Sequence, residues 1–375
     1  MKFSIKTSEL KKGLDIVNHA TASVTTTPIL ENILLKVNYK NIVLTSNNLE
    51  MAIEYVISDD IQIENEGSFC VPSKLFTSYI ALVNDDTINI ELGNDDSIKL
   101  QSASGKLKIK GFNSDEFPLI PAIKEEISLA LSGKVVRKSI EKTLFSSAEG
   151  NIRPTLAGIS VRINNDMAIF ASTDSFRLSE YSAKLEHTVE HTFYGIIPNK
   201  TAHQIRSIVH DTDTVKIVSG ESQIAFLSGN TKIYSRLLNG KFPDYGNFFP
   251  TGYSTKAEVN RIDLIGALKK INLVSRENNY SIKMSIGGET GILLETSETQ
   301  IGEGSIHLVG AVDGEDNIVG VNSTYFLEVL GVIETTHVSI SFESPLSPIL
   351  ISPVTDPEKD KSNDDFKHII MPLKI

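Results

Sequence analysis

The sequence is poor in cysteine and has no tryptophan: Cys70 is the only thiol in 375 residues. A single thiol excludes an intramolecular disulfide framework and is typical of a reducing compartment. No stretch approaches the length of apolar chain that crosses a membrane, and the opening residues Met-Lys-Phe-Ser-Ile-Lys lack the apolar core of a signal peptide. We therefore expect a soluble, cytoplasmic protein with no membrane partner.

An excess of positive charge is also missing, since the formal net charge is −11 at neutral pH. A protein that wraps nucleic acid with its whole surface needs an excess of Lys and Arg for the phosphates. The composition excludes that mode of binding. It leaves open a protein with one basic face and one acidic face.

Recognisable catalytic motifs are absent too, because there is neither a Gly-rich loop ending in Lys-Ser/Thr nor a Gly-x-Ser-x-Gly elbow. Cys70 stands in an expected strand and is predicted to be a core thiol. We predict no catalytic residue, no cofactor and no enzymatic activity.

One segment matches a metal motif: His187-Thr-Val-Glu190-His191 has the H-x-x-E-H spacing of some zinc peptidases. That chemistry needs both histidines on one helix face. The alternating β-branched flanks predict instead a strand leading towards Ile197, on which the two histidines would lie about 13 Å apart. We predict no metal site, and a hydrolase using these three residues remains an alternative.

What the chain does contain is an internal repeat of about 125 residues. The segment 71–76 (Val-Pro-Ser-Lys-Leu-Phe) returns at 197–200 as Ile-Pro-Asn-Lys and at 321–326 as Val-Asn-Ser-Thr-Tyr-Phe. The segment Thr-Pro-Ile-Leu-Glu-Asn-Ile at 27–33 is matched at 153–159 by Arg-Pro-Thr-Leu-Ala-Gly-Ile. So many matches in the same order predict three copies of one unit, which we bound at 1–121, 122–250 and 251–375.

Each unit is predicted to contain two helices and several short strands. Apolar spacing and capping residues place the helices at 8–20, 72–83, 134–145, 199–210, 260–271 and 322–334. Two helices cannot cover both faces of a sheet with so many antiparallel strands. We therefore predict an α+β fold with the helices on one face and the antiparallel sheets on the other. Three such units in series would form a crescent, and a symmetric dimer of crescents would close into a ring.

The helical windows carry a positive balance. They hold twelve Lys and Arg against six Asp and Glu, a formal charge of +6. Because the whole chain has a net charge of −11, the residues outside the windows carry −17. If the helices line the inside of an arc, its inner wall attracts a polyanion without reading sequence. The alternative is that Lys and Arg, as good helix formers, only solvate exposed helix faces. The candidate DNA-contacting residues are Lys11, Lys12, Lys74, Lys134, Arg137, Lys138, Lys142, Arg153, Lys200, Arg206, Lys269 and Lys270.

Three further segments are distinctive: 171–178 (Ala-Ser-Thr-Asp-Ser-Phe-Arg-Leu), 240–245 (Gly-Lys-Phe-Pro-Asp-Tyr) and the terminal 370–375 (Ile-Met-Pro-Leu-Lys-Ile). Together with Met-Lys-Phe-Ser at 1–4 and the segment at 27–32, they resemble the bacterial DNA polymerase III beta subunit, the sliding clamp family. The resemblance covers the whole chain, with the three repeats in order. It implies a non-enzymatic processivity factor: two crescents of three clamp domains close a ring around duplex DNA, with the helices inside.

The resemblance also implies a pocket for partner peptides from polymerase, clamp loader and repair proteins. An apolar cleft with few polar groups suits an extended peptide with Leu or Phe anchors. Without the resemblance, about half of these residues would simply be expected in the core. The matching residues are Leu156, Thr173, Ser175, Phe176, Arg177, Leu178, Pro243, Asn247, Phe248, Tyr325, Leu346, Pro348, Ile369, Met371, Pro372 and Leu373.

The dimer contact that the resemblance implies joins the edge at Leu107 and Ile109 of one subunit to Leu273 and Val274 of the other. The chain departs from the family at four places. Phe176 stands where His is common and Lys374 where Arg is usual, the loop 23–27 lacks an arginine, and 356–365 is an added acidic loop. A protein scaffold that never contacts DNA is the remaining alternative of a different class.

Overall fold

The computed structural model describes residues 1–22, 25–150, 152–289, 291–355 and 364–374. The chain forms two compact units, one made of residues 1–136 and 204–237 and the other of residues 137–203 and 238–375. We call them the first unit and the second unit. The acidic loop predicted at 356–365 lies outside the described residues except for its last two positions.

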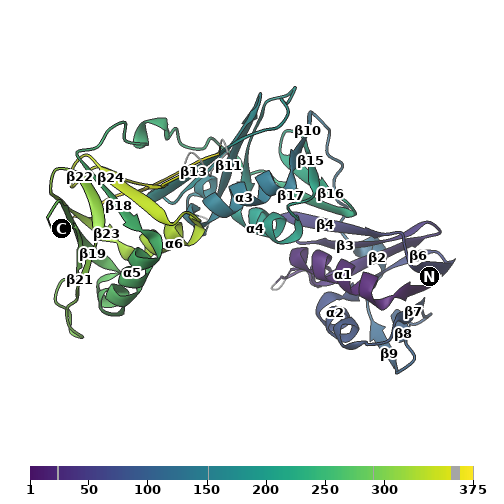
Figure 1. The fold of residues 1–375 in the computed structure, drawn as a ribbon. Coiled ribbons are helices and arrows are strands. Elements are labelled where there is room, and N and C mark those ends of the chain that lie inside the picture. The colour runs from purple at the N-terminus through teal and green to yellow at the C-terminus, as the bar shows by residue number, and fades with distance from the viewer. Residues whose placement is uncertain (23–24, 151, 290, 356–363, 375) are drawn as a thin grey trace. The chain divides into compact units, whose positions relative to one another are not determined.

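Six α-helices are described, and each falls on a window predicted from the sequence (Figure 1). They are α1 (Thr7–Val17), α2 (Ser73–Leu82), α3 (Gly133–Thr143), α4 (Asn199–Ile208), α5 (Arg261–Ser275) and α6 (Ser323–Val332). Within the described residues, no helix is long and apolar enough to cross a membrane.

The first unit holds two antiparallel sheets. One has the strand order β5-β1-β7-β8-β9 and the other the order β10-β15-β16-β17-β4-β3-β2-β6. Their bounds are β1 Lys2–Lys6, β2 Asn32–Asn38, β3 Asn41–Asn47, β4 Met51–Ile57, β5 Ile61–Asn65, β6 Gly67–Pro72, β7 Thr87–Leu92, β8 Ser97–Gln101, β9 Lys106–Lys110, β10 Ile127–Ser132, β15 Thr214–Ser219, β16 Gln223–Ser228 and β17 Thr231–Arg236. Helix α1 packs on β3 and β4 with α2 beside it (Figure 1), so these helices cover one sheet face as predicted.

The second unit is built in the same way. Its sheets have the orders β14-β11-β12-β13-β26-β25-β24-β18-β22 and β21-β20-β19-β23, with α5 packed on α6 and on β18, β20 and β21. The bounds are β11 Gly158–Asn164, β12 Met167–Thr173, β13 Arg177–Lys184, β14 Phe193–Pro198, β18 Thr255–Asn260, β19 Ser281–Gly287, β20 Gly291–Glu295, β21 Ser305–Leu308, β22 Gly310–Gly314, β23 Asn317–Asn322, β24 His337–Phe342, β25 Ile349–Pro353 and β26 Asp365–Ile370.

The repeat predicted from the sequence is visible in equivalent backbone contacts. At the start of the first helix of each copy, the backbone N–H donates to a carbonyl in the turn that precedes a later strand. The three contacts join Thr7 to Asp86 at 2.8 Å, Gly133 to Asp213 at 2.7 Å and Arg261 to Thr336 at 2.9 Å. Core positions repeat as well, since Phe76, Ala202 and Phe326 are all buried at the same place in the second helix of each copy. The three copies therefore share one fold.

Two sequence-based expectations about local structure have different outcomes. Cys70 lies in β6 with no exposed surface, as predicted, and burial raises the pKa of its thiol to about 12. The strand predicted across His187–His191 is wrong, because this segment forms the exposed connection between β13 and β14. The first repeat has the strand β5 near this position, so the second copy has replaced a strand with a loop.

Candidate functional site

The second unit contains a cavity of about 300 Å³ beside the paired strands β13 and β26. We call it the β13–β26 cleft. Apolar side chains dominate its lining, with a few hydroxyls and one guanidinium. It is lined by Leu156, Thr173, Ser175, Arg177, Leu178, Pro243, Phe248, Pro348, Ile369 and Met371. All ten belong to the pocket predicted from the sequence.

The wall of the cleft is set by strand pairing between segments distant in sequence. Leu178 of β13 stands opposite Ile369 of β26, and beyond the last strand residue the N–H of Met371 donates to the carbonyl of Phe176 at 2.8 Å. Leu178 and Ile369 belong to a buried cluster with Phe242 and other apolar residues. The pairing thus fixes both strands, and the cluster supports the floor of the cleft.

A tight turn before β13 forms one rim. The Oδ1 atom of Asp174 accepts the backbone N–H groups of Phe176 at 2.9 Å and Arg177 at 3.0 Å. Ser175 between them has φ of 82°, in the left-handed region that few side chains adopt. Thr173 Oγ1 accepts the N–H of Ser175 at 3.1 Å and donates to the carbonyl of Arg177 at 2.6 Å. The rim is therefore held in one conformation by its own side chains.

Arg177 is buried, with 8% of its surface exposed, and its guanidinium is held from several sides. Its Nε donates to Asp174 Oδ2 at 2.9 Å, one terminal nitrogen donates to Glu328, and the other donates to the carbonyl of Phe145 at 2.7 Å. The guanidinium carbon lies 4.4 Å from the ring centroid of Tyr325, a cation–π contact. Three of its N–H groups donate hydrogen bonds inside the unit, so Arg177 mainly shapes the lining of the cleft.

Behind this wall lies a buried polar chain. The Nδ1 atom of His368 is 2.8 Å from the hydroxyl of Ser179, which is 2.7 Å from the hydroxyl of Ser146. Burial, together with the charge of Arg177, lowers the pKa of His368 to about 3. Among the described residues, its Nε2 atom has no hydrogen-bond partner. This imidazole is therefore neutral at physiological pH.

Six predicted pocket residues do not line the cavity. Phe176 and Leu346 are exposed, at 59% and 75%, and Asn247 is exposed in a short 3-10 helix. Tyr325 lies under the guanidinium of Arg177. Pro372 and Leu373 are half-buried, and the N–H of Leu373 donates to the carbonyl of Gly320 at 2.8 Å. Phe176, Asn247 and Leu346 remain candidates for a rim that a longer ligand would contact.

Sequence reasoning missed the residues that hold Arg177, namely Asp174, Glu328 and Phe145. A local signal did exist for Asp174, because it stands only three residues before Arg177 within the distinctive segment 171–178. Glu328 is separated from Arg177 by 151 positions, so no local pattern could find it.

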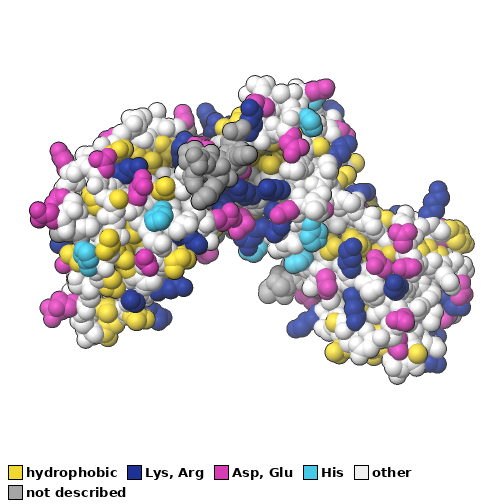
Figure 2. Space-filling view, in the orientation of Figure 1, with side chains coloured by type: hydrophobic (Ala, Val, Ile, Leu, Met, Phe, Trp, Pro, Cys, Tyr) yellow, Lys and Arg dark blue, Asp and Glu magenta, His cyan; other side chains and the backbone are white. Residues whose placement is uncertain are grey.

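The predicted DNA-contacting residues differ in how far their side chains are exposed. The exposed members are Lys12, Lys74, Lys134, Arg153, Lys200, Lys269 and Lys270. Lys11, Arg137, Lys138 and Arg206 are half-buried. Lys11 donates to the carbonyl of Val83 at 2.7 Å, and Lys138 pairs with Asp364 at 3.2 Å. Figure 2 shows Lys and Arg side chains standing next to Asp and Glu over the face in view.

The prediction that Lys142 contacts DNA is wrong. Only 5% of its surface is exposed, its Nζ donates to the carbonyl of Val332, and Glu334 lies 3.5 Å away. Burial lowers the pKa of its ammonium group. Because it already serves as an internal hydrogen-bond donor, it is not available to phosphate.

The predicted dimer-contact residues lie near strand edges. Ile109 is in β9, at the edge of its sheet, and its side chain is 1% exposed, so in a contact along this edge its backbone rather than its side chain would face a partner. Leu107 on the same strand is half-buried. In the second unit, 76% of Leu273 is exposed and Val274 is half-buried, both on α5, which packs on the edge strand β21.

Within the described parts of the chain, no group of three or more His, Cys, Asp or Glu side chains could hold a metal ion. His187, Glu190 and His191 lie in the connection between β13 and β14, which is not helical. A zinc site of the H-x-x-E-H type requires the two histidines on one face of a helix.

Comparison with known proteins covers the whole chain. Three family models match in order: the DNA polymerase III beta subunit N-terminal domain at residues 1–121, its central domain at 130–244 and its C-terminal domain at 247–374. The beta sliding clamp of Staphylococcus epidermidis is 28% identical over all of this chain and 99% of its own. That of Bacillus subtilis (strain 168) is 27% identical over all of both chains.

Solved structures agree in fold. The beta subunit of the DNA polymerase of Streptococcus pyogenes has a TM-score of 0.93 at 26% identity, with all of both chains covered. The DNA polymerase sliding clamp of Bacillus subtilis has a TM-score of 0.92 at 26% identity, covering all of this chain and 99% of that one. The three matched domains and the shared fold show that this chain belongs to the DNA polymerase III beta subunit family of sliding clamps.

Proposed function

We propose that the chain acts as a homodimeric ring that encircles duplex DNA and increases the processivity of DNA polymerase III without catalysing a reaction. The observation that supports this most strongly is the three family domains matched in order along the whole chain. We take the domain boundaries to be 1–121, 122–250 and 251–375. A bacterial replication clamp works in the cytoplasm, and that is the location we propose.

The second part of the proposal is that the β13–β26 cleft docks partner proteins. Its volume of about 300 Å³ is at the lower limit of ligand pockets, enough for a few side chains of an extended peptide. Leu178, Ile369 and Phe248 offer apolar surface for Leu and Phe anchors. The proposed partners are the polymerase III core, the clamp loader, other polymerases and repair factors.

The third part is that helix-borne cations contact the duplex. Phosphate contacts made by exposed lysines are independent of sequence and weaken with salt. Lys12, Lys74 and Lys134 belong to the first unit, and Lys269 and Lys270 to α5 of the second. The surplus of positive charge in the helical segments, against the net charge of −11, supports a channel role.

The dimer is proposed to close through the exposed Leu273 and the neighbouring Val274, against the β9 edge of a second subunit. Exchanging both for Ala should give folded monomers, because the contact would lose most of its apolar area. Sedimentation of the variant measures this, and an unchanged dimer contradicts the interface.

The function as a whole is tested by retention on DNA. The protein is loaded on a nicked circular plasmid, which is then cut once. A ring stays on the circle and leaves the linear molecule through its ends. A protein scaffold that never contacts DNA is not retained on either form, and a simple DNA-binding protein is retained equally on both; each of these results contradicts the proposal.

A further inference from the structure

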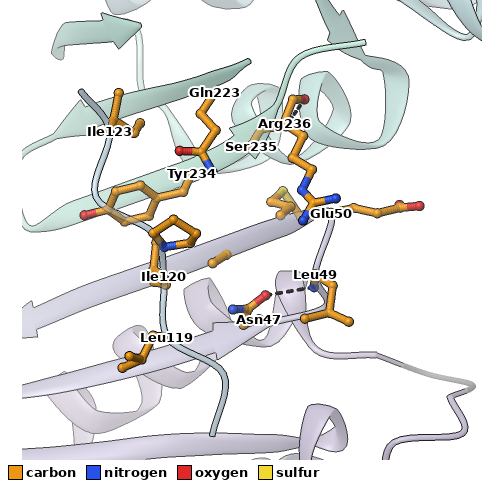
Figure 3. Close-up of a pocket in the computed structure, with 13 residues that line it drawn as sticks. Asn47, Leu49, Glu50, Leu119, Ile120, Ile123, Gln223, Tyr234, Ser235 and Arg236 are labelled. Carbon is orange, nitrogen blue, oxygen red and sulfur yellow. Dashed lines mark hydrogen bonds between the residues drawn. The ribbon is translucent and has the colours of Figure 1, made fainter. Parts of the chain in front are cut away.

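The first unit contains a second, smaller cleft beside the paired strands β4 and β17 (Figure 3). We call it the β4–β17 cleft. Its volume is about 100 Å³. Nothing in the resemblance or in the family matches assigns a role to it.

The backbone of this cleft repeats that of the β13–β26 cleft. Leu49 has φ of 72° and Ser175, 126 positions later, has φ of 82°, so both rims make the same left-handed turn. The N–H of Leu49 donates to Asn47 Oδ1 at 2.8 Å, as that of Ser175 does to Thr173 Oγ1 at 3.1 Å. A left-handed leucine is uncommon, and the surrounding structure therefore imposes this conformation.

The strand that closes each cleft is also equivalent. The N–H of Arg236, at the end of β17, donates to the carbonyl of Glu50 at 3.2 Å. The N–H of Met371 makes the same bond to Phe176. Glu50 and Phe176 are again 126 positions apart. Arg236 thus occupies in the first unit the place that Met371 has in the second.

The side chains differ in a way that changes what each cleft accepts. Met51 stands at the position of the paired Arg177, 126 residues before it, and the lining includes Ile123, whereas that of the β13–β26 cleft includes Phe248. The exposed Arg236 brings a cation to a rim where the other cleft has an apolar methionine. Figure 3 shows the guanidinium of Arg236 extended over β4, with the carboxylate of Glu50 pointing away from it.

The volume limits the occupant. A cavity of about 100 Å³ is well below the size of ligand pockets and suits one aliphatic side chain. The apolar lining supplied by Met51, Ala52 and Ile123 suits that side chain, and the cation at the rim suits a carboxylate next to it.

We propose that the β4–β17 cleft is a second docking site, for an extended segment of a partner protein that carries one aliphatic side chain followed by an acidic residue. The aliphatic side chain enters between Met51 and Ile123, and the carboxylate pairs with Arg236. The proposal rests on the proposed function in one respect, the docking of peptides at the equivalent cleft. It gives the ring two classes of peptide site with different charge preferences.

Methionine methyl groups report on the two clefts separately. The chain has five methionines, of which Met51 lines one cleft and Met371 the other. The full-length protein is labelled with ¹³C at the methionine methyls and titrated with acetyl-Ala-Leu-Asp-Ala-amide. Met51→Leu and Met371→Leu assign the two signals. The expected result is a saturable shift of the Met51 signal at millimolar peptide, and a weaker response, by about threefold to fivefold, to the same peptide with Asn for Asp.

Two surface variants test the assignment without disturbing the core. Arg236→Gln should lower the affinity for the Asp peptide by the same threefold to fivefold. Leu49→Asp should abolish the response through charge repulsion, and Asp tolerates the left-handed conformation better than Leu. Lys232→Gln, on β17 but outside the lining, is the matched control and should leave the response unchanged.

A Met51 signal that does not move at millimolar peptide, or that moves equally in Leu49→Asp, overturns the proposal. A peptide with Leu and Phe anchors serves as the second probe. Failure of Met371 to respond to it overturns the docking role of the β13–β26 cleft. The two failures are distinguished by which methyl signal stays still.

Discussion

The two clefts have the same backbone and different chemistry. Both have a left-handed rim residue, and both are closed by a backbone N–H at the end of a neighbouring strand, from Arg236 in the first unit and from Met371, just beyond β26, in the second. In the second unit, however, Asp174 and Arg177 form a buried ion pair, where the first unit has Asn48 and Met51. The repeat thus preserves the position of a cleft, and each copy lines that cleft with different side chains.

The buried polar groups of the second unit continue behind its cleft. His368 pairs with Ser179, whereas the equivalent pair in the first unit is Ile233 opposite Ile53. A buried ion pair or imidazole adds little net stability compared with apolar side chains, and removing one partner is costly. We infer that the second unit keeps these groups to hold one cleft shape, and that exchange of residues between the copies can test this.

The largest effect is expected from Arg177→Met, which gives the second unit the residue of the first. Asp174 then loses its counter-charge at a site where its side chain is 17% exposed. The free energy of unfolding should fall by about 3 kcal/mol, as for other half-broken buried pairs. Urea unfolding measures this. The control is Lys184→Met, whose pair with Asp166 at 3.8 Å is exposed, and which should cost less than about 0.5 kcal/mol. An equal decrease in the free energy of unfolding in both variants would show that the Asp174–Arg177 pair stabilises the fold no more than an exposed pair does.

The next effect concerns pH. The pKa of His368 is about 3 in the folded chain and about 6.5 when unfolded, so below pH 6.5 the unfolded state binds the extra proton. The free energy of unfolding should therefore fall as pH decreases, by about 2 kcal/mol between pH 6.5 and 5. His368→Ile, which copies Ile233, should remove this part of the pH dependence. Thermal unfolding over this range measures it, and parallel curves for both proteins would contradict the account.

The smallest effect distinguishes exposed from buried lysines. Exchanging Lys269 and Lys270 for Gln should reduce the slope of log affinity for duplex DNA against log salt by about two, one for each lost phosphate contact. Lys142→Gln should leave that slope unchanged and lower the stability, because its Nζ is used inside the unit. Fluorescence anisotropy at several salt concentrations gives the slopes. A change of slope in Lys142→Gln alone would reverse the assignment.

The fold was largely predictable because its signals are local and repeated. Apolar spacing located all six described helices, and matched segments such as 71–76 and 197–200 indicated the copies. The lining of the β13–β26 cleft was identified through the family resemblance, since nothing local joins Leu156 to Met371.

What the sequence did not reveal depends on contacts between distant segments. The buried Lys142 donates a hydrogen bond to the carbonyl of Val332, 190 positions away, and Arg177 donates one to Glu328, 151 positions away. Neither has a periodic pattern. The loop at His187–His191 was mistaken for a strand because its β-branched flanks have strand propensity, which tertiary context overrides. The β4–β17 cleft depends on the pairing of two strands that are about 180 positions apart, which no local pattern predicts.

The docking role of the β13–β26 cleft is tested most directly by calorimetric titration of a peptide with Leu and Phe anchors. The intact chain is compared with one that lacks residues 371–375. Met371 lines the cavity, and the loss of about two buried anchors should cost about 3–6 kcal/mol. Micromolar binding to the intact chain should become undetectable in the truncated chain, while sedimentation still shows a folded dimer. Undiminished affinity in the truncated, folded dimer would contradict the assignment of the cleft.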